Sequence, residues 1–241
     1  GKGLIMLLHG APGVGKTSTA GTWKECVAAL HARPLFPITC GDLGMTPAEV
    51  ETNLDFNFQL AESWGCVLLL DEADVFLAER TKSDVKLFLR ALEYYRGILI
   101  LTTNRVGTID EAFRSRIHIS LLYTPLSWDQ THAIWSSHLE RLISQGRAIT
   151  DKVIILAYAQ EIWSKQVARY KVAWNGRQIR NAFQTAVALA EYEHVGASNQ
   201  ANTPTKPVLE RRHFEVVADA SVEFDQYLQS TLGATAPHYA R

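Results

Sequence analysis

Eight residues near the start of the chain have the types and spacing that hold a phosphate group. They run from Gly10 to Thr17 and fit the pattern G-x-x-x-x-G-K-[ST]. The glycines let backbone N–H groups converge on phosphate oxygens without an intervening Cβ. Lys16 can reach the β- and γ-phosphates of a nucleotide, and the Thr17 hydroxyl suits Mg²⁺. The residues predicted to contact a nucleotide here are Gly10, Ala11, Pro12, Gly13, Val14, Gly15, Lys16, Thr17 and Ser18.

Two adjacent carboxylates, Asp71 and Glu72, follow the apolar run Val67–Leu70. Ligands of open α/β sheets bind at the carboxyl ends of the strands, so we expect this pair at the same edge as the glycine-rich loop. We predict that Asp71 holds Mg²⁺ through a water molecule and that Glu72 polarises a water for attack on the γ-phosphate. Adjacent acids also begin surface helices, and the prediction therefore depends on their combination with the loop.

The segments around these groups alternate between short apolar runs and helical patterns. We expect strands at Leu4–Leu8, Leu35–Cys40, Val67–Leu70, Ile98–Thr102 and Ile117–Leu121. We expect helices between them at Thr17–Ala32, Pro47–Trp64, with Thr46 as its N-cap, and Val85–Tyr95. Strands that alternate with helices predict a five-stranded, mostly parallel sheet sandwiched by helices over residues 1–125.

After Pro125 the apolar residues follow helical spacing only. We expect one helix to begin after Ser127, and further helices at Asp151–Tyr170, Gly176–His194 and Glu210–Leu228. The polar stretch 196–207 is typical of a loop, and residues 233–241 are expected to form a frayed tail. The fold class is therefore an α/β domain followed by a small all-helical domain over residues 126–241.

Composition excludes several classes of protein. The chain has 241 residues, of which 24 are basic and 25 acidic, so its net charge is −1; this argues against a broad nucleic-acid-binding surface, which is usually basic. The apolar share of 47% supports a sizeable core and excludes wholesale disorder. No apolar run approaches the ~18 residues of a membrane span.

The cysteines indicate the compartment. Cys26, Cys40 and Cys66 are scattered and form no C-x-x-C pair, which argues against a disulfide framework and against a zinc site. We therefore expect an intracellular, reducing compartment, with cytoplasm, nucleus and mitochondrial matrix left open.

The sequence resembles the AAA+ superfamily of ATPases, and within it fungal AAA-family ATPases. The resemblance rests on the loop and acidic pair above and on three further segments: Leu101–Arg105, Ile109–Arg116 and Asn175–Arg180. It implies a P-loop NTPase core followed by an AAA+ lid domain, with ATP and Mg²⁺ as ligands and ATP hydrolysis as the activity.

The same resemblance implies roles for four polar side chains. Asn104 would orient the attacking water, although it also suits a plain strand-end turn. Arg116, with Arg114 as a second candidate, would reach the γ-phosphate of a neighbouring subunit, a task that suits a permanently charged side chain with several donors. Arg177 would contact the phosphates within its own subunit. The alternative for each arginine is a solvated side chain or a surface ion pair.

The resemblance further implies a ring, expected to be a homohexamer, that remodels a macromolecule, with a protein as the expected substrate. Two alternatives stay open: an ATP-gated switch or scaffold with slow hydrolysis, and a DNA-dependent ATPase of the initiator or clamp-loader type. The near-neutral charge counts against the second, so we do not expect nucleic acid as a partner.

Two departures from the family pattern concern the central pore. Protein-threading members carry an aromatic residue where this chain has Gly41–Ala48, which contains no Phe, Tyr or Trp and offers Met45 as the only large apolar residue expected at its tip. The interval between Glu72 and Asn104 is also short. The sequence thus leaves open whether polypeptide is threaded and whether a segment is missing near residues 81–87.

Overall fold

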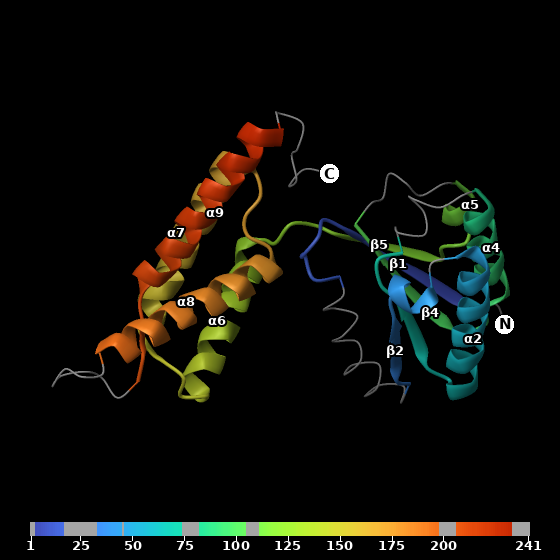
Figure 1. Cartoon of the computed structure of the whole chain (residues 1–241), viewed down its shortest axis with the longest axis horizontal. Helices are drawn as coiled ribbons and strands as arrows, with labels where there is room; N and C mark the ends of the chain where they lie inside the picture. Colours follow the sequence, from blue (N-terminus) through green and yellow to red (C-terminus); the bar gives the residue numbers. More distant parts are fainter. Residues whose placement is uncertain are drawn as a thin grey trace. The chain divides into compact units, whose positions relative to one another are not determined.

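The computed structural model describes residues 3–16, 33–44, 46–73, 82–104, 111–197 and 206–232. The chain divides into two compact units, Gly1–Thr124 and Pro125–Arg241. The first contains a sheet with helices against it, and the second consists mainly of helices (Figure 1). Within the described residues, no helix is long and apolar enough to cross a membrane.

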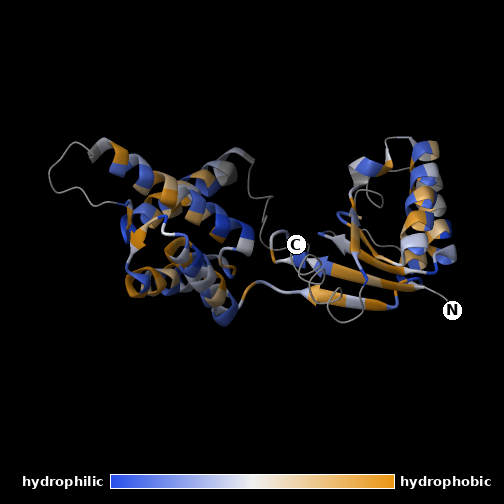
Figure 2. Ribbon diagram, turned by 90° about the horizontal axis from the view of Figure 1, so that it is seen from below, coloured by the Kyte–Doolittle hydropathy of each residue, from blue (hydrophilic) through white to orange (hydrophobic). Residues whose placement is uncertain are grey.

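The first unit is built on five parallel strands in the order β2-β3-β4-β1-β5, which confirms the predicted sheet. The strands are β1 (Leu4–Gly10), β2 (Leu35–Ile38), β3 (Val67–Leu70), β4 (Ile98–Thr103) and β5 (Ile119–Tyr123). The inner strands β3 and β4 are buried almost throughout, which is why their sequences are continuous apolar runs rather than alternating ones. Figure 2 shows how the strands differ from the helices: the strands are largely apolar, whereas apolar and polar residues alternate along the helices.

Three helices pack against one face of the sheet: α2 (Pro47–Trp64), α4 (Lys82–Tyr94) and the short α5 (Glu111–Arg114). The helix α2 begins as predicted, because the Thr46 hydroxyl accepts from the N–H of Glu49 and the Glu49 carboxylate accepts in return from the N–H of Thr46. Phe88 and Phe113 stack in the core between α4 and α5. The helix predicted at Thr17–Ala32 lies outside the described residues.

Strand β2 is shorter than predicted, because the chain turns into the 3-10 helix η1 (Cys40–Leu43) directly after it. The Asp42 carboxylate accepts from the N–H of Thr39 at 2.7 Å and from its hydroxyl at 2.8 Å. These two bonds lower the pKa of Asp42 and close the turn. A local side-chain turn of this kind competes with continuation of a strand.

Strand β5 begins two residues later than predicted. The N–H of Arg116 still donates to the carbonyl of Phe113, and that of Ile117 to the carbonyl of Arg114. These bonds extend the helical turn of α5, so the chain becomes free to pair with β1 only afterwards.

The second unit has a separate core. Its helices are α6 (Trp128–Ser144), α7 (Lys152–Tyr170), α8 (Gly176–Ala197) and α9 (Arg211–Leu232). Trp135, Phe183 and Phe214 meet at its centre with ring centroids 4.9–5.1 Å apart. The unit is helical as predicted, apart from a parallel pair of two-residue strands, β6 (Ile149–Thr150) and β7 (Val208–Leu209).

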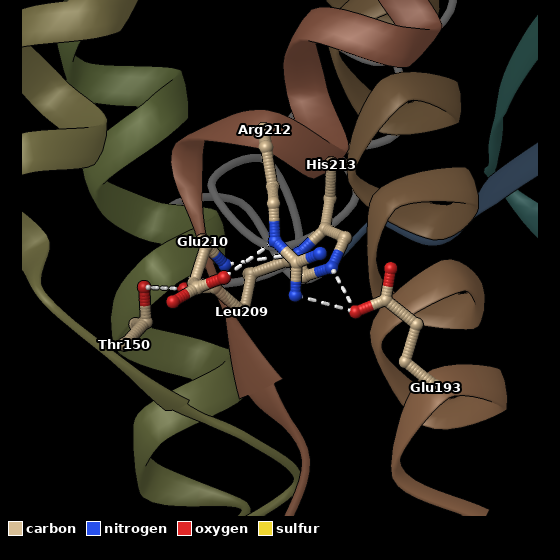
Figure 3. Close-up of polar contacts among 6 residues, drawn as sticks. All are labelled: Thr150, Glu193, Leu209, Glu210, Arg212 and His213. Carbon is tan, nitrogen blue, oxygen red and sulfur yellow. Dashed lines mark hydrogen bonds and ion pairs between the residues drawn. The ribbon is translucent and has the colours of Figure 1, made fainter. Parts of the chain in front are cut away.

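A polar cluster, formed by Glu193, Glu210, Arg212 and His213, fixes the start of α9 against α8 (Figure 3). The Nδ1 atom of His213 accepts from the N–H of Glu210 at 3.0 Å, so Nε2 carries the proton and donates to Glu193 at 3.2 Å. Arg212 pairs with both glutamates at 2.6 Å. The hydrogen bond from His213 is the main cause that lowers the pKa of Glu193, and the charge of Arg212 is a smaller one.

Candidate active site

The glycine-rich loop follows β1, as the sequence pattern requires. Gly10 has a φ of 147°, and a Cβ built there would lie 2.2 Å from the carbonyl oxygen of Tyr123, so only glycine fits. Gly15 has a φ of 102°, and its Cβ would meet no heavy atom within 4 Å. The backbone of the loop is therefore open at Gly15, where a phosphate group can approach it.

Lys16 is held inside this loop, with 6% of its side chain exposed. Its Nζ donates to the carbonyl oxygens of Gly10 and Ala11, at 2.7 Å in each case. Burial and the Lys16 ammonium together lower the pKa of His9, which keeps that imidazole neutral near neutral pH. The loop thus concentrates one fixed positive charge, as an anion site needs.

The acidic pair lies where β3 ends. The N–H of Asp71 donates to the carbonyl of Ile38 at 3.1 Å, which continues the pairing of β3 with β2. Glu72 follows with a φ of 58°, a left-handed conformation that is uncommon outside glycine, and its side chain is exposed. The chain therefore turns sharply at Glu72 instead of continuing the strand. Such a backbone conformation is typical of functional sites.

Thr102 joins the two acids, and the sequence analysis assigned it no role. Its hydroxyl donates to Oδ1 of Asp71 and accepts from the N–H of Glu72 at 3.0 Å. Its carbonyl accepts from the N–H of Ala73 at 2.8 Å. Thr102 is 2% exposed, so its own side of these bonds is shielded from water. The signal in the sequence was a hydroxyl at the end of an otherwise apolar run.

Asn104 directly follows β4 and is half-buried. Because β1, β3 and β4 are parallel and adjacent, the residues after them share one edge of the sheet. The structure thus brings Lys16, Asp71, Glu72 and Asn104 to the same edge, as their positions in the sequence predicted. Thr17 and Ser18, which complete the predicted nucleotide contacts, lie outside the described residues.

The two arginines of the Ile109–Arg116 segment differ in their surroundings. Arg114 is exposed at the end of α5. Arg116 donates to the carbonyl of Ala112 at 2.6 Å and pairs with Glu93 of α4 at 3.1 Å. Within one chain, Arg116 is thus engaged in an ion pair, and its role toward a neighbouring subunit stays a prediction.

Arg177 belongs to the second unit, in the first turn of α8, where it is exposed. Asn175 caps this helix, because its Oδ1 accepts from the N–H of Gln178 at 2.9 Å. The Gln178 Oε1 accepts in return from the N–H of Asn175 at 2.9 Å. The cap fixes the start of the helix one residue before Arg177, and the predicted contact with phosphates stays a prediction.

The residues at the sheet edge fit a magnesium–nucleotide complex. Mg²⁺ prefers oxygen ligands, and Asp71 offers a carboxylate held by the Thr102 hydroxyl. The loop offers one buried ammonium at Lys16 and an open backbone at Gly15, which suits phosphate oxygens. The set contains a place for the phosphates, an oxygen ligand for the metal and an exposed carboxylate, Glu72, for proton transfer.

Sequence comparison finds two matching families along the chain. Residues 6–124 match the ATPase family associated with various cellular activities (AAA), and residues 126–235 match the fungal AAA+ ATPase lid domain. The human ATPase family AAA domain-containing protein 3B is 28% identical over 190 residues, which are 72% of this chain and 28% of that protein. The chain thus matches little more than a quarter of that relative's length.

Two solved structures share the fold. The AAA domain of FIGL-1, crystallised with ADP, has a TM-score of 0.67 at 19% identity and covers 95% of this chain and 78% of that one. A chain of the HORMA:CdnC:Trip13 complex of Escherichia coli MS115-1 has a TM-score of 0.65 at 17% identity, covering 90% of this chain and 74% of that one.

Proposed function

This chain belongs to the AAA+ family of ATPases, and from that membership we propose that it works as a subunit of a homohexameric ring that remodels a protein substrate. The chain is an ATPase domain of the AAA+ type. In our proposal, residues 1–125 bind the nucleotide and residues 126–241 form the lid domain. The convergence of Lys16, Asp71, Glu72 and Asn104 at one sheet edge supports the ATP-hydrolysing part of the proposal, and the ring and its protein substrate rest on the family membership.

Binding of ATP is assigned to the glycine-rich loop. The open backbone at Gly15 and the ammonium of Lys16 support contacts with the β- and γ-phosphates. Thr17 and Asp71 would hold Mg²⁺, Asp71 through water, and the ion when bound would neutralise phosphate charge in the transition state. Thr102 keeps the Asp71 carboxylate in place, because its hydroxyl donates to it.

Hydrolysis is assigned to Glu72 and Asn104. The Glu72 carboxylate accepts the proton of the water that attacks the γ-phosphorus, and the Asn104 amide orients that water. The N–H of Glu72 is fixed on Thr102 at 3.0 Å, which limits the positions that its carboxylate can reach. Positioning of this kind is the main contribution that a protein makes to phosphoryl transfer.

We assign Arg116 to the γ-phosphate of a neighbouring subunit, with Arg114 as the second candidate. The pair between Arg116 and Glu93 is partly solvated and therefore weak, so a phosphate can replace the carboxylate as its partner. Arg177 is assigned to the phosphates of its own subunit. The assembly would then be needed for full activity.

The test compares wild-type protein with Glu72→Gln. An amide matches the carboxylate in shape but accepts no proton, so ATP binding should persist while turnover falls by about 10²–10⁴-fold. Phosphate release and ATP affinity would be measured, and mass photometry with ATP would report assembly. Glu51→Gln, at an exposed position of α2, is the matched control.

Two results would contradict parts of this proposal. Full turnover in Glu72→Gln would remove Glu72 from the mechanism. A particle that stays monomeric with ATP, while wild-type protein hydrolyses ATP normally, would exclude the ring. Slow turnover that a protein substrate does not stimulate would favour the switch or scaffold.

A further inference from the structure

The second unit contains a groove of about 950 Å³ that the ATPase mechanism does not use. Its walls are the helices α7 and α9, and it is also lined by Trp174, which precedes α8, and by Gln178 and Asn181 in the first turns of α8. Large and small apolar side chains from α7, from α9 and from the segment before α8 line it: Tyr158, Ile162, Trp174, Ala218, Val222 and Phe224.

The lining residues follow helical spacing along both walls. On α9 they include Arg211, Glu215, Ala218, Val222 and Asp225, at alternating steps of four and three residues. The α7 wall repeats these steps from residue 158 to residue 169. Side chains at such steps form one stripe along a helix. The α9 stripe runs from Arg211 to Asp225, and these 14 residue steps span ~21 Å at 1.5 Å per step, which is the length of about four helical turns.

The walls are joined at one end of the groove. There the Arg211 guanidinium lies 5.0 Å from the ring centroid of Tyr158 and pairs with Glu161 at 3.0 Å. It also pairs with Glu215 of its own helix at 2.7 Å. The charges at this end are therefore satisfied within the unit.

Farther along, the two walls carry opposite charges that do not meet. Asp219 and Asp225 on the α9 wall, and Arg169 on the α7 wall, make no ion pair within the described part of the chain. Arg169 lies over Tyr170 at 5.1 Å, and Lys165 pairs with Glu161 on its own helix at 2.6 Å. Burial raises the pKa of Asp225, so a cation beside it would be favourable.

We propose that this groove binds an amphipathic helix of a partner protein, about four turns long. Its apolar face would contact the floor, with basic residues on the flank toward α9 and acidic residues on the flank toward α7. The charge of the two walls and the length of the stripe carry this assignment. Helix-in-groove binding of this kind is a common mode of peptide recognition.

The backbone requirements favour a helix over an extended peptide. The walls are helices, whose backbone groups are bonded internally along their length. They offer no strand edge, so an extended peptide would find no backbone ladder in the groove and would depend on side chains or water for its own N–H and C=O groups. A helix satisfies these groups itself. A compact small molecule would use only part of a groove of this length.

The probes are three synthetic 15-residue helical peptides that share one leucine stripe. The first carries Lys on one flank and Glu on the other, the second carries Lys on both flanks, and the third Glu on both. Reversing the direction of a helix in the groove exchanges its flanks, so the first peptide matches the walls in one of its two directions. It should bind about three- to tenfold more tightly than the others, less so at high salt. Anisotropy of the labelled peptides would measure this.

The groove is then changed at its acidic wall. The double variant Asp219→Lys, Asp225→Lys makes both walls basic and should make the peptide with two Glu flanks the tightest binder. Glu223→Lys is the control, because it reverses one acidic charge on α9 outside the groove lining, half of the charge change in the double variant. Ala218→Trp should weaken all three peptides at least threefold by filling the groove, and circular dichroism would verify that each variant is folded.

Three results would overturn the proposal: equal affinities for the three peptides, the same preference in the double variant as in Glu223→Lys, or unchanged binding in Ala218→Trp. ATP turnover of the same preparations is measured separately and should match that of wild-type protein. The binding assay needs no nucleotide, so its outcome is independent of the proposed function.

Discussion

The sheet edge and the polar cluster at the start of α9 are both dense in charged and polar groups, yet they are organised differently. At the edge, the backbone of Glu72 is fixed through Thr102 while its carboxylate is exposed. In the cluster, Arg212 and His213 both bind the carboxylate of Glu193. Polar density alone thus does not identify a reactive site. The sheet edge differs from the cluster in Glu72, whose backbone N–H is fixed by Thr102 while its carboxylate is exposed to solvent.

The largest expected effect concerns Arg116, which would complete the edge from a neighbouring subunit. Arg116→Ala should bind ATP normally but hydrolyse it about 10³–10⁵-fold more slowly. Glu93→Gln breaks the same ion pair while it keeps the arginine, so its turnover should stay near that of wild-type protein. Phosphate release would be measured for both. Equal loss in the two variants would assign Arg116 a structural role.

Mixed rings test whether that arginine acts between subunits. Lys16→Ala should lose ATP binding, because Lys16 supplies the buried ammonium of the loop. When it is mixed with Arg116→Ala, the intact nucleotide site of one variant meets the intact arginine of the other. Turnover should then exceed that of either variant alone. If mixed rings form, as judged by sizing, without such a gain, Arg116 does not act in trans.

A smaller effect is expected at Thr102, which holds both acids. Thr102→Val keeps the shape but removes the hydroxyl, and the loss of about 1–3 kcal/mol of hydrogen bonding should lower kcat by roughly tenfold or more. Thr102→Ser keeps the hydroxyl and should remain close to wild-type turnover. The comparison of kcat, KM and Tm separates positioning from folding. A Thr102→Val variant that loses stability but keeps kcat would refute the positioning role.

In the cluster, a substitution should change stability and not turnover. His213 is 2% exposed and accepts the N–H at the start of α9, so His213→Ala should destabilise the second unit by about 1–3 kcal/mol. His213→Asn keeps an acceptor near that N–H and should cost less. Urea unfolding measures the loss. A fall in kcat without loss of stability in His213→Ala would contradict the view that the cluster stabilises the fold whereas the sheet edge supports turnover.

The cluster also predicts a direction of pH dependence. The pKa of Glu193 is lowered in the folded chain, chiefly by the His213 hydrogen bond. Its contribution to stability is therefore complete above the unfolded pKa of about 4.3 and is lost as the pH falls through the lower folded value. Glu193→Gln should reduce this acid sensitivity in urea titrations between about pH 5 and pH 3. An unchanged slope would mean that other carboxylates dominate it.

The smallest effect is expected at an exposed pair. Arg147 and Glu191 lie 2.9 Å apart, with 52% and 43% of their side chains exposed. Because solvent screens such pairs, Arg147→Ala should cost at most about 1 kcal/mol. Thermal unfolding would compare the loss of stability in Arg147→Ala with that in His213→Ala. An equal loss would mean that the exposed ion pair stabilises the chain as much as the buried histidine does.

The sequence was sufficient to predict a structural feature where one local pattern of residues determines that feature. The apolar runs predicted the five strands, and Thr46 with Pro47 predicted the start of α2. The positions of Lys16 and of Asp71–Glu72 after such runs predicted their common edge, because parallel strands end together.

The remaining features depend on contacts between distant segments. Thr102 contacts Asp71 because β4 pairs with β3. The apolar sequences of these two strands do not by themselves specify that the strands are neighbours. The two-residue strands β6 and β7 are too short to show an alternating pattern. The groove in turn depends on how α7 and α9 pack, which neither helix specifies alone.

One consequence of the Gly10 contact is mechanical. A Cβ at Gly10 would lie 2.2 Å from the oxygen of Tyr123, so two main chains touch there with no side chain between them. A side chain can absorb a displacement by changing rotamer, whereas a main chain cannot. We therefore expect a shift of the glycine-rich loop to move the end of β5, where Tyr123 pairs with Gly10, and the first unit ends one residue later, at Thr124. In this expectation, the contact of Gly10 with Tyr123 couples the position of the loop to that of the last residue of the first unit.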